Sequence, residues 1–589
     1  MQMPSNYDKY PFIRVSDRSA DCPAGWSAIT GEIDRRLQLS DPQAAARIIV
    51  IECYQGVHEA EITSALTTKY PAAECLLSSA AMLPEDVINA FFQPDITDDE
   101  LFGYMTRHTI DRFFDAEKVT ALRARIRAVR QGVVILVGAG AAHIWPEADI
   151  LIYADMARWE IQQRFRRNEA SNLGVTNPQE RTSLQYKRAF FVDWRICDRF
   201  KKSLMKSWDY VLDTNVAGHP QMITGALFRK GLAQAAGRPF RVAPFFDPGP
   251  WGGQWLKEVC DLDREAVNFA WGFDCVPEEN SLLFGFGDLR FELPAIDLVF
   301  AHPQELLGVP VYGRFGDEFP IRFDFLDTMQ GGNLSLQVHP LTEYIREKFG
   351  MYYTQDESYY LLDAGEDAVV YLGLKDGIDP AQMLAALHDA QQSGQFDAEA
   401  YTGKYPVKKH DHVLIPGGTV HCSGNNSMVL EISATPFIFT FKLWDWGRLG
   451  LDGRPRPINI AHGEKVIQWN RTEAWVKREL VNRIETLRQE DGLREERTGL
   501  HEQEFIETRR HWFTRPALHH TDGGVNVLNL VEGREVIVES PRQAFEPVVV
   551  HYAETFIVPA AVGAYTIRPY GESEGKECAT LKAFVRHHA

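Results

Sequence analysis

Two histidines, a glutamate and a glutamine lie in one stretch of the chain, between residues 331 and 421. Gln337 and His339 are two residues apart in an apolar, β-prone run, so in a strand both side chains would point to the same face. Glu357 begins a second strand-like run, and His421 follows a Pro-Gly-Gly sequence. Two imidazoles, a carboxylate and an amide oxygen suit zinc, manganese or iron, with positions left for water or substrate. These residue types predict a site for one divalent ion.

Each residue of this set also has a purely structural explanation. A single histidine on a strand is more often a hydrogen-bonded structural residue, because imidazole can satisfy both ring nitrogens locally. What favours a metal site is the spacing P-x-G-x-x-H-x-x-x-N, formed by Pro416, Gly418, His421 and Asn425. This spacing resembles the second metal motif of the cupin β-barrels, in which the turn directs the histidine into the barrel.

A longer series of segments resembles the type I mannose-6-phosphate isomerases over about residues 240 to 589. The segments occur in the family's order: PWGG at 250–253, LSLQVHP ending at 340, the strand around Glu357, IPGGTVH ending at 421, LEISATPF with Glu431, FKLWDWGR, and DGRPRPINI. The resemblance implies that Gln337, His339, Glu357 and His421 bind one zinc-type ion.

The same resemblance implies roles for residues around the metal. Glu431 matches a glutamate that the family keeps beside the ion, so we expect it to be a base or to assist one. The alternative is a buried carboxylate paired with Lys442 or Arg448. Lys442 stands where the family has arginine, and Gln355 stands where it usually has lysine. One cation is therefore lost, and at the other position an ammonium replaces a guanidinium.

Three arginines of the loop after Asp445 can replace these anion contacts. Of these, Arg448 is expected to act with Glu431 and Lys442 in catalysis, while Arg454 and Arg456 are expected to bind substrate. Trp251, in the PWGG segment, is the further residue expected at the substrate.

The implied activity is that of a metal-dependent aldose–ketose isomerase. The expected reaction interconverts mannose 6-phosphate and fructose 6-phosphate through a cis-enediol intermediate. Two alternatives stay open: an isomerase of an unphosphorylated or different aldose, and a non-catalytic carbohydrate-sensing protein. The intact ligand set with Glu431 favours the enzyme, whereas Gln355 favours the alternatives.

The chain should form a multidomain protein. Residues 1–235 alternate apolar strands, at 46–52, 132–138 and 149–154, with helix-like runs, which predicts a parallel α/β domain. Their layout resembles a P-loop, uridine-kinase-like nucleoside kinase domain. The phosphate loop of that family needs lysine and serine or threonine, but residues 54–59 read YQGVHE and 138–143 read GAGAAH. We therefore expect no kinase activity, and a role in packing, oligomerisation or nucleotide sensing instead.

The remainder should be an all-β double cupin, or jelly-roll, module. We expect a catalytic cupin over 236–465 with a small helical insertion at about 378–403, where Asp379 and Pro380 start a helix and Gly394 ends it. Residues 466–589 should contain an exposed helix at 472–489 and a second, metal-free cupin. That second half has His519 and His520 but no P-x-G-x-x-H sequence.

Composition sets the class of partner and the compartment. The net charge of −19 disfavours nucleic acid and anionic membranes as partners, which leaves a small-molecule sugar or sugar phosphate. The eight cysteines contain no C-x-x-C pair, the N-terminus lacks the features of a secretory signal, and the longest apolar run, 132–144, is too short to span a bilayer. We therefore expect reduced thiols and a cytoplasmic protein of undetermined oligomeric state. The cationic, aromatic run 186–202 is expected to form an exposed amphipathic helix.

Overall fold

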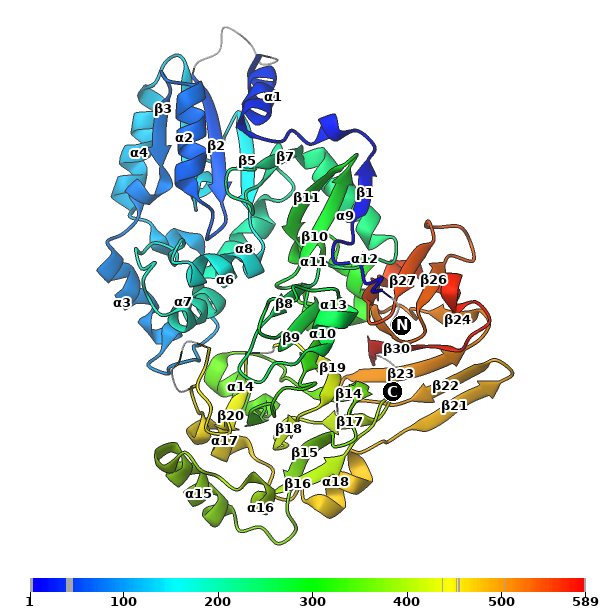
Figure 1. Ribbon diagram of the computed structural model, residues 1–589. Helices are drawn as coiled ribbons and strands as arrows, with labels where there is room; N and C mark the ends of the chain where they lie inside the picture. Colours follow the sequence, from blue (N-terminus) through cyan, green and yellow to red (C-terminus); the bar gives the residue numbers. More distant parts are fainter. Residues whose placement is uncertain are drawn as a thin grey trace. The chain divides into compact units, whose positions relative to one another are not determined.

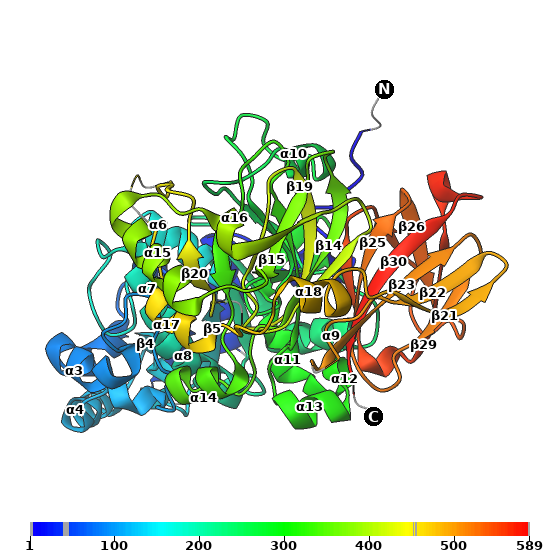
Figure 2. The same cartoon turned by 90° about the horizontal axis from the view of Figure 1, so that it is seen from below.

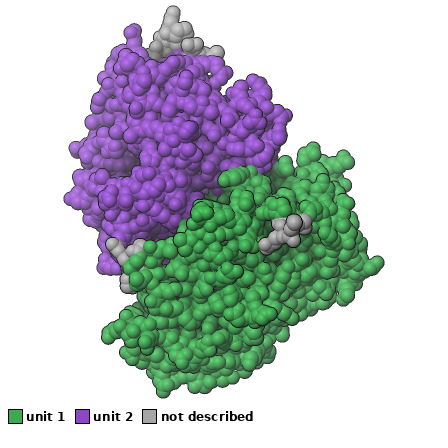
Figure 3. All heavy atoms as spheres, in the orientation of Figure 1, with its two compact units in different colours: residues 1–11, 235–280, 302–589 green, residues 12–234, 281–301 purple. Residues whose placement is uncertain are grey.

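The computed structural model describes residues 4–38, 46–436, 438–451, 453, 456–502 and 504–586. The chain forms two compact units, coloured separately in Figure 3. Unit 2 comprises residues 12–234 and 281–301, and unit 1 comprises residues 1–11, 235–280 and 302–589. The expected boundary at 235 lies next to the end of the first segment of unit 2. However, residues 281–301, expected in the catalytic cupin, belong to the α/β unit, and residues 1–11 belong to unit 1.

The core of unit 2 is a six-stranded sheet in the order β3-β4-β2-β5-β6-β7 (Figure 1). The strands are β2 (Arg47–Cys53), β3 (Glu74–Leu77), β4 (Val133–Gly138), β5 (Ile150–Asp155), β6 (Tyr210–Asp213) and β7 (Gln221–Thr224). All neighbours are parallel except β6 and β7. The central strands β2 and β4 are nearly continuous apolar runs, as expected for a parallel sheet covered on both faces.

Helices alternate with these strands, as the sequence predicts. The main ones are α1 (Trp26–Gln38), α2 (Glu59–Lys69), α3 (Glu85–Ile96), α4 (Ala116–Ala128), α6 (Arg158–Arg166), α7 (Thr182–Arg188), α8 (Trp194–Leu204) and α9 (Gly225–Ala236). Helix α4 begins where the Asp115 side chain accepts hydrogen bonds from the amides of Glu117 and Lys118.

The expectation of an exposed helix over residues 186–202 is wrong. The segment is helical, running through α7, a π-helical turn (Ala189–Asp193) and α8, but three of its cations, Lys187, Arg188 and Lys201, are buried. Lys201 Nζ lies 2.7 Å from Asp155 Oδ1 and 2.9 Å from Asp297 Oδ1. These carboxylates lie far away in sequence, so a local pattern could not show that the lysine is neutralised in the core.

The segment 281–301 is built into unit 2 by strand pairing and by polar contacts. Strands β1 (Ile13–Ser16), β10 (Ser281–Phe286) and β11 (Leu289–Pro294) form a three-stranded sheet, followed by α11 (Ile296–Ala301). Asp297 of α11 is the second partner of Lys201, and the amide of Glu292 donates to Asp213 at the end of β6.

Unit 1 contains two barrels, each made of two antiparallel sheets. In the first barrel, one sheet has the order β17-β14-β19-β12-β9-β8 and the other β16-β15-β18-β13-β20. The strands are β8 (Phe245–Asp247), β9 (Trp271–Cys275), β12 (Ile321–Asp327), β13 (Leu336–Val338), β14 (Glu357–Ala364), β15 (Val369–Leu374), β16 (Thr402–Pro406), β17 (His412–Ile415), β18 (His421–Ser423), β19 (Ser427–Ala434) and β20 (Phe441–Trp444).

Helical segments interrupt and follow this barrel. They are α10 (Trp255–Val259), α12 (Pro303–Leu307), α13 (Val309–Phe315), α14 (Thr342–Phe349), α15 (Pro380–Ser393), α16 (Ala398–Tyr401), α17 (Ile460–Val466) and α18 (Glu473–Glu479). The insertion expected after Glu357 corresponds to α15 and α16, and Asp379 caps α15 by accepting from the amide of Ala381. Gly394 ends α15 in the left-handed conformation, with φ 69°.

The second barrel, orange to red in Figures 1 and 2, repeats the strand order of the first. Its sheets are β21-β22-β23-β30-β25-β28 and β24-β29-β26-β27, so β12 to β19 correspond in chain order to β23 to β30. The strands are β21 (Glu485–Glu490), β22 (Leu493–Arg497), β23 (Ile506–Phe513), β24 (Ala517–His520), β25 (Asn526–Glu532), β26 (Glu535–Glu539), β27 (Val548–His551), β28 (Thr555–Val558), β29 (Ala564–Pro569) and β30 (Cys578–Val585).

The exposed helix expected over residues 472–489 is wrong in its second half. Helix α18 ends at Glu479, and Glu485–Glu490 is strand β21. This strand forms a hairpin with β22 around Gly492, whose φ of 69° suits a tight turn. Its alternating charged residues find cross-strand partners, such as Arg497 with Glu485, which a helical interpretation of the same charges missed.

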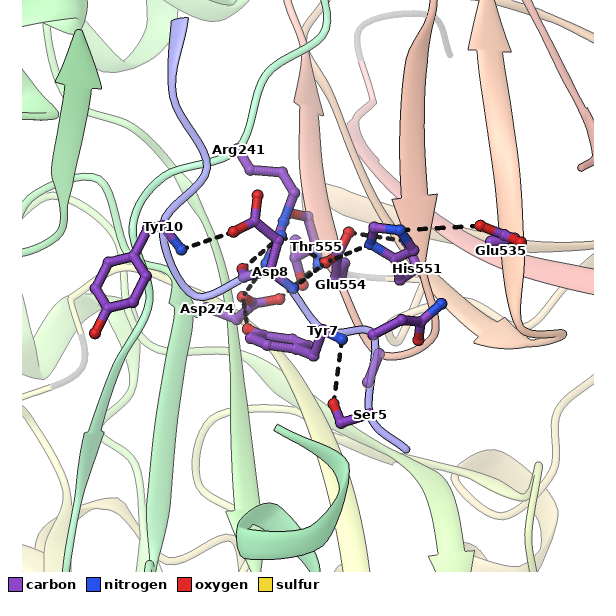
Figure 4. A network of polar contacts seen from close by, with 12 residues as sticks. Ser5, Tyr7, Asp8, Tyr10, Arg241, Asp274, Glu535, His551, Glu554 and Thr555 are labelled. Carbon is purple, nitrogen blue, oxygen red and sulfur yellow. Dashed lines mark hydrogen bonds and ion pairs between the residues drawn. The ribbon is translucent and has the colours of Figure 1, made fainter. Parts of the chain in front are cut away.

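The N-terminal segment connects the two barrels of unit 1 (Figure 4). The Tyr7 hydroxyl donates to Asp274 of β9 at 2.5 Å, and the amide of Asp8 donates to Glu554 at 2.6 Å. Arg241 lies between these carboxylates, 2.8 Å from Glu554 and 3.4 Å from Asp274. We call Tyr7, Arg241, Asp274 and Glu554 the barrel clasp.

Two expectations drawn from composition can be compared with the structure. All eight cysteines are free. None of the helices among the described residues combines the length and the apolar character needed to cross a membrane.

Candidate metal centre

His339, Glu357 and His421 converge inside the first barrel. One ligand atom from each lies within 4.8 Å of the others, and all three side chains are buried. Glu357 Oε2 is 3.1 Å from His339 Nε2, and Glu357 Oε1 is 2.7 Å from His421 Nε2. His421 begins β18, and His339 directly follows β13 of the same sheet, whereas Glu357 begins β14 of the other sheet. The site therefore lies between the two sheets.

The strand register brings Gln337 to the same place. Gln337 of β13 is directly opposite His421 of β18, and its amide nitrogen is 3.3 Å from His421 Nε2. Rotation of the amide by half a turn would present its oxygen at this point. The structure therefore brings together all four residues predicted to bind the metal.

Hydrogen bonds at the other ring nitrogens set the two imidazoles. His339 Nδ1 lies 3.2 Å from the carbonyl oxygen of Phe439, and His421 Nδ1 lies 2.8 Å from that of Thr419. A carbonyl can only accept, so both Nδ1 atoms are donors, and in the neutral imidazoles both Nε2 atoms carry lone pairs. Buried lone pairs thus face a buried carboxylate, and His339 Nε2 and Glu357 Oε1 have no hydrogen-bond partner. A cation would satisfy all of these atoms, so the residues fit a metal ion.

A tight turn aims His421 into the barrel. The amide of Gly418 donates to the carbonyl of His339 at 2.8 Å, and the Thr419 hydroxyl donates to Pro416. Gly418 has φ 87°, and a Cβ there would come within 2.8 Å of the Val466 carbonyl oxygen. The glycine is therefore needed both for its conformation and for space.

Glu431 lies close to Glu357. Its partner is Arg322, and not Lys442 or Arg448, which the alternative interpretation had suggested. Its Oε1 accepts from Arg322 Nη1 at 2.9 Å and from the Ser433 hydroxyl at 3.0 Å. Gln355 Nε2 connects the two acids, 3.4 Å from Glu431 Oε1 and 3.2 Å from Glu357 Oε2. Burial, together with the nearby Asp324, raises the pKa of Glu431 well above its usual range.

Arg322 is the site residue that sequence reasoning missed. It lies on β12, where it also binds Asp324 at 2.9 Å through Nη2. A usable signal was present, because Arg322 and Asp324 alternate with Ile321, Phe323 and Phe325 in an otherwise apolar strand. Charges at alternate positions on such a strand point into the barrel rather than to solvent.

The predicted cations gather beside Gln337. Lys442 of β20 is opposite Gln337, and burial lowers its pKa to about 7. Asp445 accepts from Arg448 at 2.6 Å and from Arg456 at 2.9 Å, and Arg456 also donates to the Ser335 hydroxyl. Arg454 lies outside the described residues.

Trp251 is in a different environment from the one expected. Its side chain is 1 % exposed and packs edge-on against Trp271, with ring centroids 4.8 Å apart. Its carbonyl accepts from the amide of Gly332, in the loop that precedes β13. These contacts make Trp251 a support for the loop before the metal strand.

Comparisons with known proteins show what two parts of the chain are similar to. A domain of unknown function, DUF8485, matches residues 25–237. The chain is 28% identical over 234 residues to mannose-6-phosphate isomerase of Streptococcus mutans, which is 38% of this chain and 68% of that protein. It is 26% identical over 231 residues to mannose-6-phosphate isomerase ManA of Bacillus subtilis, which is 39% of this chain and 68% of that protein.

Among solved structures, the mannose 6-phosphate isomerase of Bacillus subtilis aligns with a TM-score of 0.48 and 18% identity, covering 59% of this chain and 99% of that one. Over 38% to 39% of its length the chain is therefore similar to curated mannose-6-phosphate isomerases, and this similarity supports the resemblance to the type I, cupin family.

Proposed function

We propose that the first barrel is a metal-dependent aldose–ketose isomerase that interconverts mannose 6-phosphate and fructose 6-phosphate through a cis-enediol. The observation that carries this proposal is the convergence of buried ligand atoms from His339, Glu357 and His421, of which His339 Nε2 and Glu357 Oε1 have no hydrogen-bond partner. The names of the curated relatives support the reaction.

Gln337, His339, Glu357 and His421 would hold the ion, which we assign as zinc, with manganese or iron as alternatives. When bound, such an ion supplies a Lewis acid that stabilises negative charge on the sugar oxygens. All four of these side chains are buried, so the chain itself would limit the access of water to the ion.

Glu431 is the residue we propose to move the proton between C1 and C2. Its Oε1 is occupied by Arg322, Ser433 and Gln355, whereas its Oε2 accepts no hydrogen bond from the described residues. A carboxylate fixed at one oxygen and open at the other is oriented for proton transfer. Burial raises the pKa of Glu431 above its usual range, which makes the carboxylate a stronger base than a solvent-exposed glutamate.

The cationic group of Lys442, Arg448 and Arg456 would bind the phosphate. Arg448 and Arg456 both pair with Asp445, and Lys442 is opposite Gln337 in the sheet. One observation favours a neutral aldose as the second candidate substrate: both described arginines are already paired with Asp445.

For unit 2 we propose a kinase-like fold that does not transfer phosphate. The loop after β2 lacks the lysine and hydroxyl that phosphate binding needs. In addition, Glu52 accepts from the amides of Gly140 and Ala142 at 2.7 and 2.8 Å, and Glu59 accepts from that of Ala139 at 3.3 Å. Backbone amides that could hold a phosphate are thus taken by side chains of the chain itself.

The test of the proposed function is formation of ketose by the metal-loaded full-length protein. It should convert mannose 6-phosphate to fructose 6-phosphate, and His421→Ala should abolish the conversion. Turnover of free mannose alone would assign the neutral substrate instead. Absence of turnover on every aldose, with metal bound, would leave the carbohydrate-sensing alternative.

A further inference from the structure

The second barrel has a polar cluster at the position that corresponds to the metal centre of the first. In the first barrel Gln337 of β13 is opposite His421 of β18, and in the second His519 of β24 is opposite Tyr565 of β29. Both pairs lie between corresponding strands, because β24 and β29 occupy the places of β13 and β18.

The pairing of β14 with β17 in the first barrel and of β25 with β28 in the second supports this correspondence. Glu357 is the first residue of β14 and is opposite Ile415, the last residue of β17. Asn526 is the first residue of β25 and is opposite Val558, the last residue of β28. The contact between the sheets is also repeated, since the Tyr565 hydroxyl donates to Asn526 Oδ1 at 2.9 Å.

The side chains at these positions have changed from metal ligands to neutral polar groups. His519, Tyr565 and Asn526 stand in place of Gln337, His421 and Glu357. The carboxylate is therefore lost, and the three groups of the second barrel do not form a strong ligand set for a cation. The charges on the adjoining strands are inverted. Asp324 is opposite Glu431 in the first barrel, and at the corresponding register Arg509 is opposite Lys582.

Several buried polar atoms of this cluster have no hydrogen-bond partner. His519 is 3 % exposed, and neither of its ring nitrogens is bonded. Its ring stacks on Tyr565, with centroids 5.2 Å apart, and meets His511 edge-on at 4.5 Å. His511 Nδ1 and the hydroxyl of Thr580, which faces His511 across β23 and β30, are also unbonded. Such atoms are rare in proteins and call for an explanation.

Lys582 adds a positive charge to the cluster. Its side chain is 7 % exposed and lies on the same face of β30 as Thr580. Its Nζ makes no hydrogen bond or ion pair with the described residues. It lies 5.3 Å from the centroid of the Phe584 ring. Burial lowers the pKa of Lys582 to about 8, so it is still mainly charged at neutral pH.

The carboxylates near this lysine have other partners: Glu495 and Glu507 pair with Arg509, and Asp522 lies 2.9 Å from His520 Nδ1. Arg509 Nε lies 2.6 Å from Glu507, and Nη1 lies 3.0 Å from Glu495. A lysine whose side chain is largely buried and has no ion pair is stabilised by an anion that binds its ammonium group. His519 and Thr580 each have a buried hydrogen-bond donor that no acceptor among the described residues satisfies.

We propose that the second barrel binds a small oxyanion, of the carboxylate or phosphate class, through Lys582, His519 and Thr580. The first barrel would then hold a cation and the second an anion at corresponding positions. This site is independent of the proposed isomerase activity, because none of its residues belongs to the first barrel.

The test is calorimetric titration of the full-length, metal-loaded protein with inorganic phosphate and, separately, with acetate. We expect one of the two anions to bind, and Lys582→Met to weaken this binding by at least tenfold, the effect of losing one charge-assisted hydrogen bond. Lys576→Met, which removes an exposed lysine of the same barrel, is the matched control and should bind as the wild type does.

A second measurement protects the test against misfolding. In anion-free buffer Lys582→Met should melt at or above the wild-type temperature, because it removes an unpaired buried charge. His519→Phe should keep the ring packing on Tyr565 and also lose anion affinity. Binding of neither anion to the wild type, or equal binding by wild type and a folded Lys582→Met, would overturn the proposal.

Discussion

Arg322 and Glu431 are joined by a 2.9 Å hydrogen bond across β12 and β19, and the bond leaves Oε2 of the glutamate open. Glu431 would otherwise be a carboxylate buried between Asp324 and Glu357, two further acids. The guanidinium therefore has two effects: it offsets repulsion among the acids, and it fixes the carboxylate in one orientation.

The first prediction concerns this pair. Glu431→Gln should lower kcat by about 10²- to 10⁴-fold, the usual contribution of a positioned base, with metal content unchanged. Arg322→Lys keeps the charge but loses the second hydrogen-bonding arm, so kcat should fall less while KM stays near the wild-type value. Steady-state kinetics measure both, and Arg346→Lys on the exposed side of α14 is the matched control. Wild-type kcat in Glu431→Gln would exclude Glu431 as the base.

The second prediction concerns metal binding. Wild-type protein should hold about one divalent ion per chain, and Gln337→Ala or His421→Ala should reduce metal affinity at least 10- to 100-fold, the range seen even for residues behind the ligands. Elemental analysis after dialysis against a graded chelator measures this. His388→Ala, which removes an exposed histidine of α15, should retain the metal. Full occupancy in the double variant of Gln337 and His421 would disprove the ligand set.

The third prediction distinguishes a phosphorylated from a neutral substrate. If Arg448 and Arg456 bind phosphate, each substitution to alanine should raise KM for mannose 6-phosphate about ten- to a hundredfold, with a smaller change in kcat. KM for free mannose should not change. Both variants free Asp445 from one of its partners, so Asp445→Asn is a useful comparison. Preference of the wild type for free mannose, with neither arginine mattering, would refute phosphate recognition.

The fourth prediction concerns unit 2. The full-length chain carrying His421→Ala should show no transfer of phosphate from ATP to nucleosides. The reason is that Glu52 and Glu59 occupy the amides at residues 139–142. A radiolabelled ATP assay with a panel of nucleosides measures transfer. Product above the no-protein background would contradict this account of the loop.

The fifth prediction concerns the barrel clasp. Arg241→Met leaves Asp274 and Glu554 buried without their cation, which should cost about 3–5 kcal/mol of unit 1 stability. Calorimetry should show the transition of unit 1 at a lower temperature. Arg264→Met, an exposed arginine of the same region, should leave it unchanged. An unaltered transition in Arg241→Met would show that the clasp does not contribute to stability.

Sequence reasoning predicted which residues meet inside the first barrel because their positions are fixed by local geometry. The alternation of Gln337 and His339 and the turn at Pro416 and Gly418 are properties of short segments. It missed Arg322 as the partner of Glu431 because the two are far apart in sequence and adjacent only across the strands. The same limit explains Lys201, whose aspartate partners come from two other segments of unit 2.

The repeated barrel was foreseen, whereas its inverted charges were not. Turn sequences and alternating apolar residues indicated a second cupin from about residue 505. The correspondence of Lys582 with Glu431 depends on registers between β23 and β30 and between β12 and β19. No pattern within a single strand contains that information.

The discontinuity of unit 2 has a consequence for the order in which the chain can fold during synthesis. Strand β1 pairs with β10, and Lys201 pairs with Asp297, so both contacts must wait until residues 281–301 have left the ribosome. The DUF8485 match ends at residue 237, well before these partners are made. A fragment cut at that point would carry an unpaired edge strand and a half-neutralised lysine. Domains usually fold as units, starting from the N-terminus. In this protein, unit 2 is completed only after residues 235–280 of unit 1 have been synthesised.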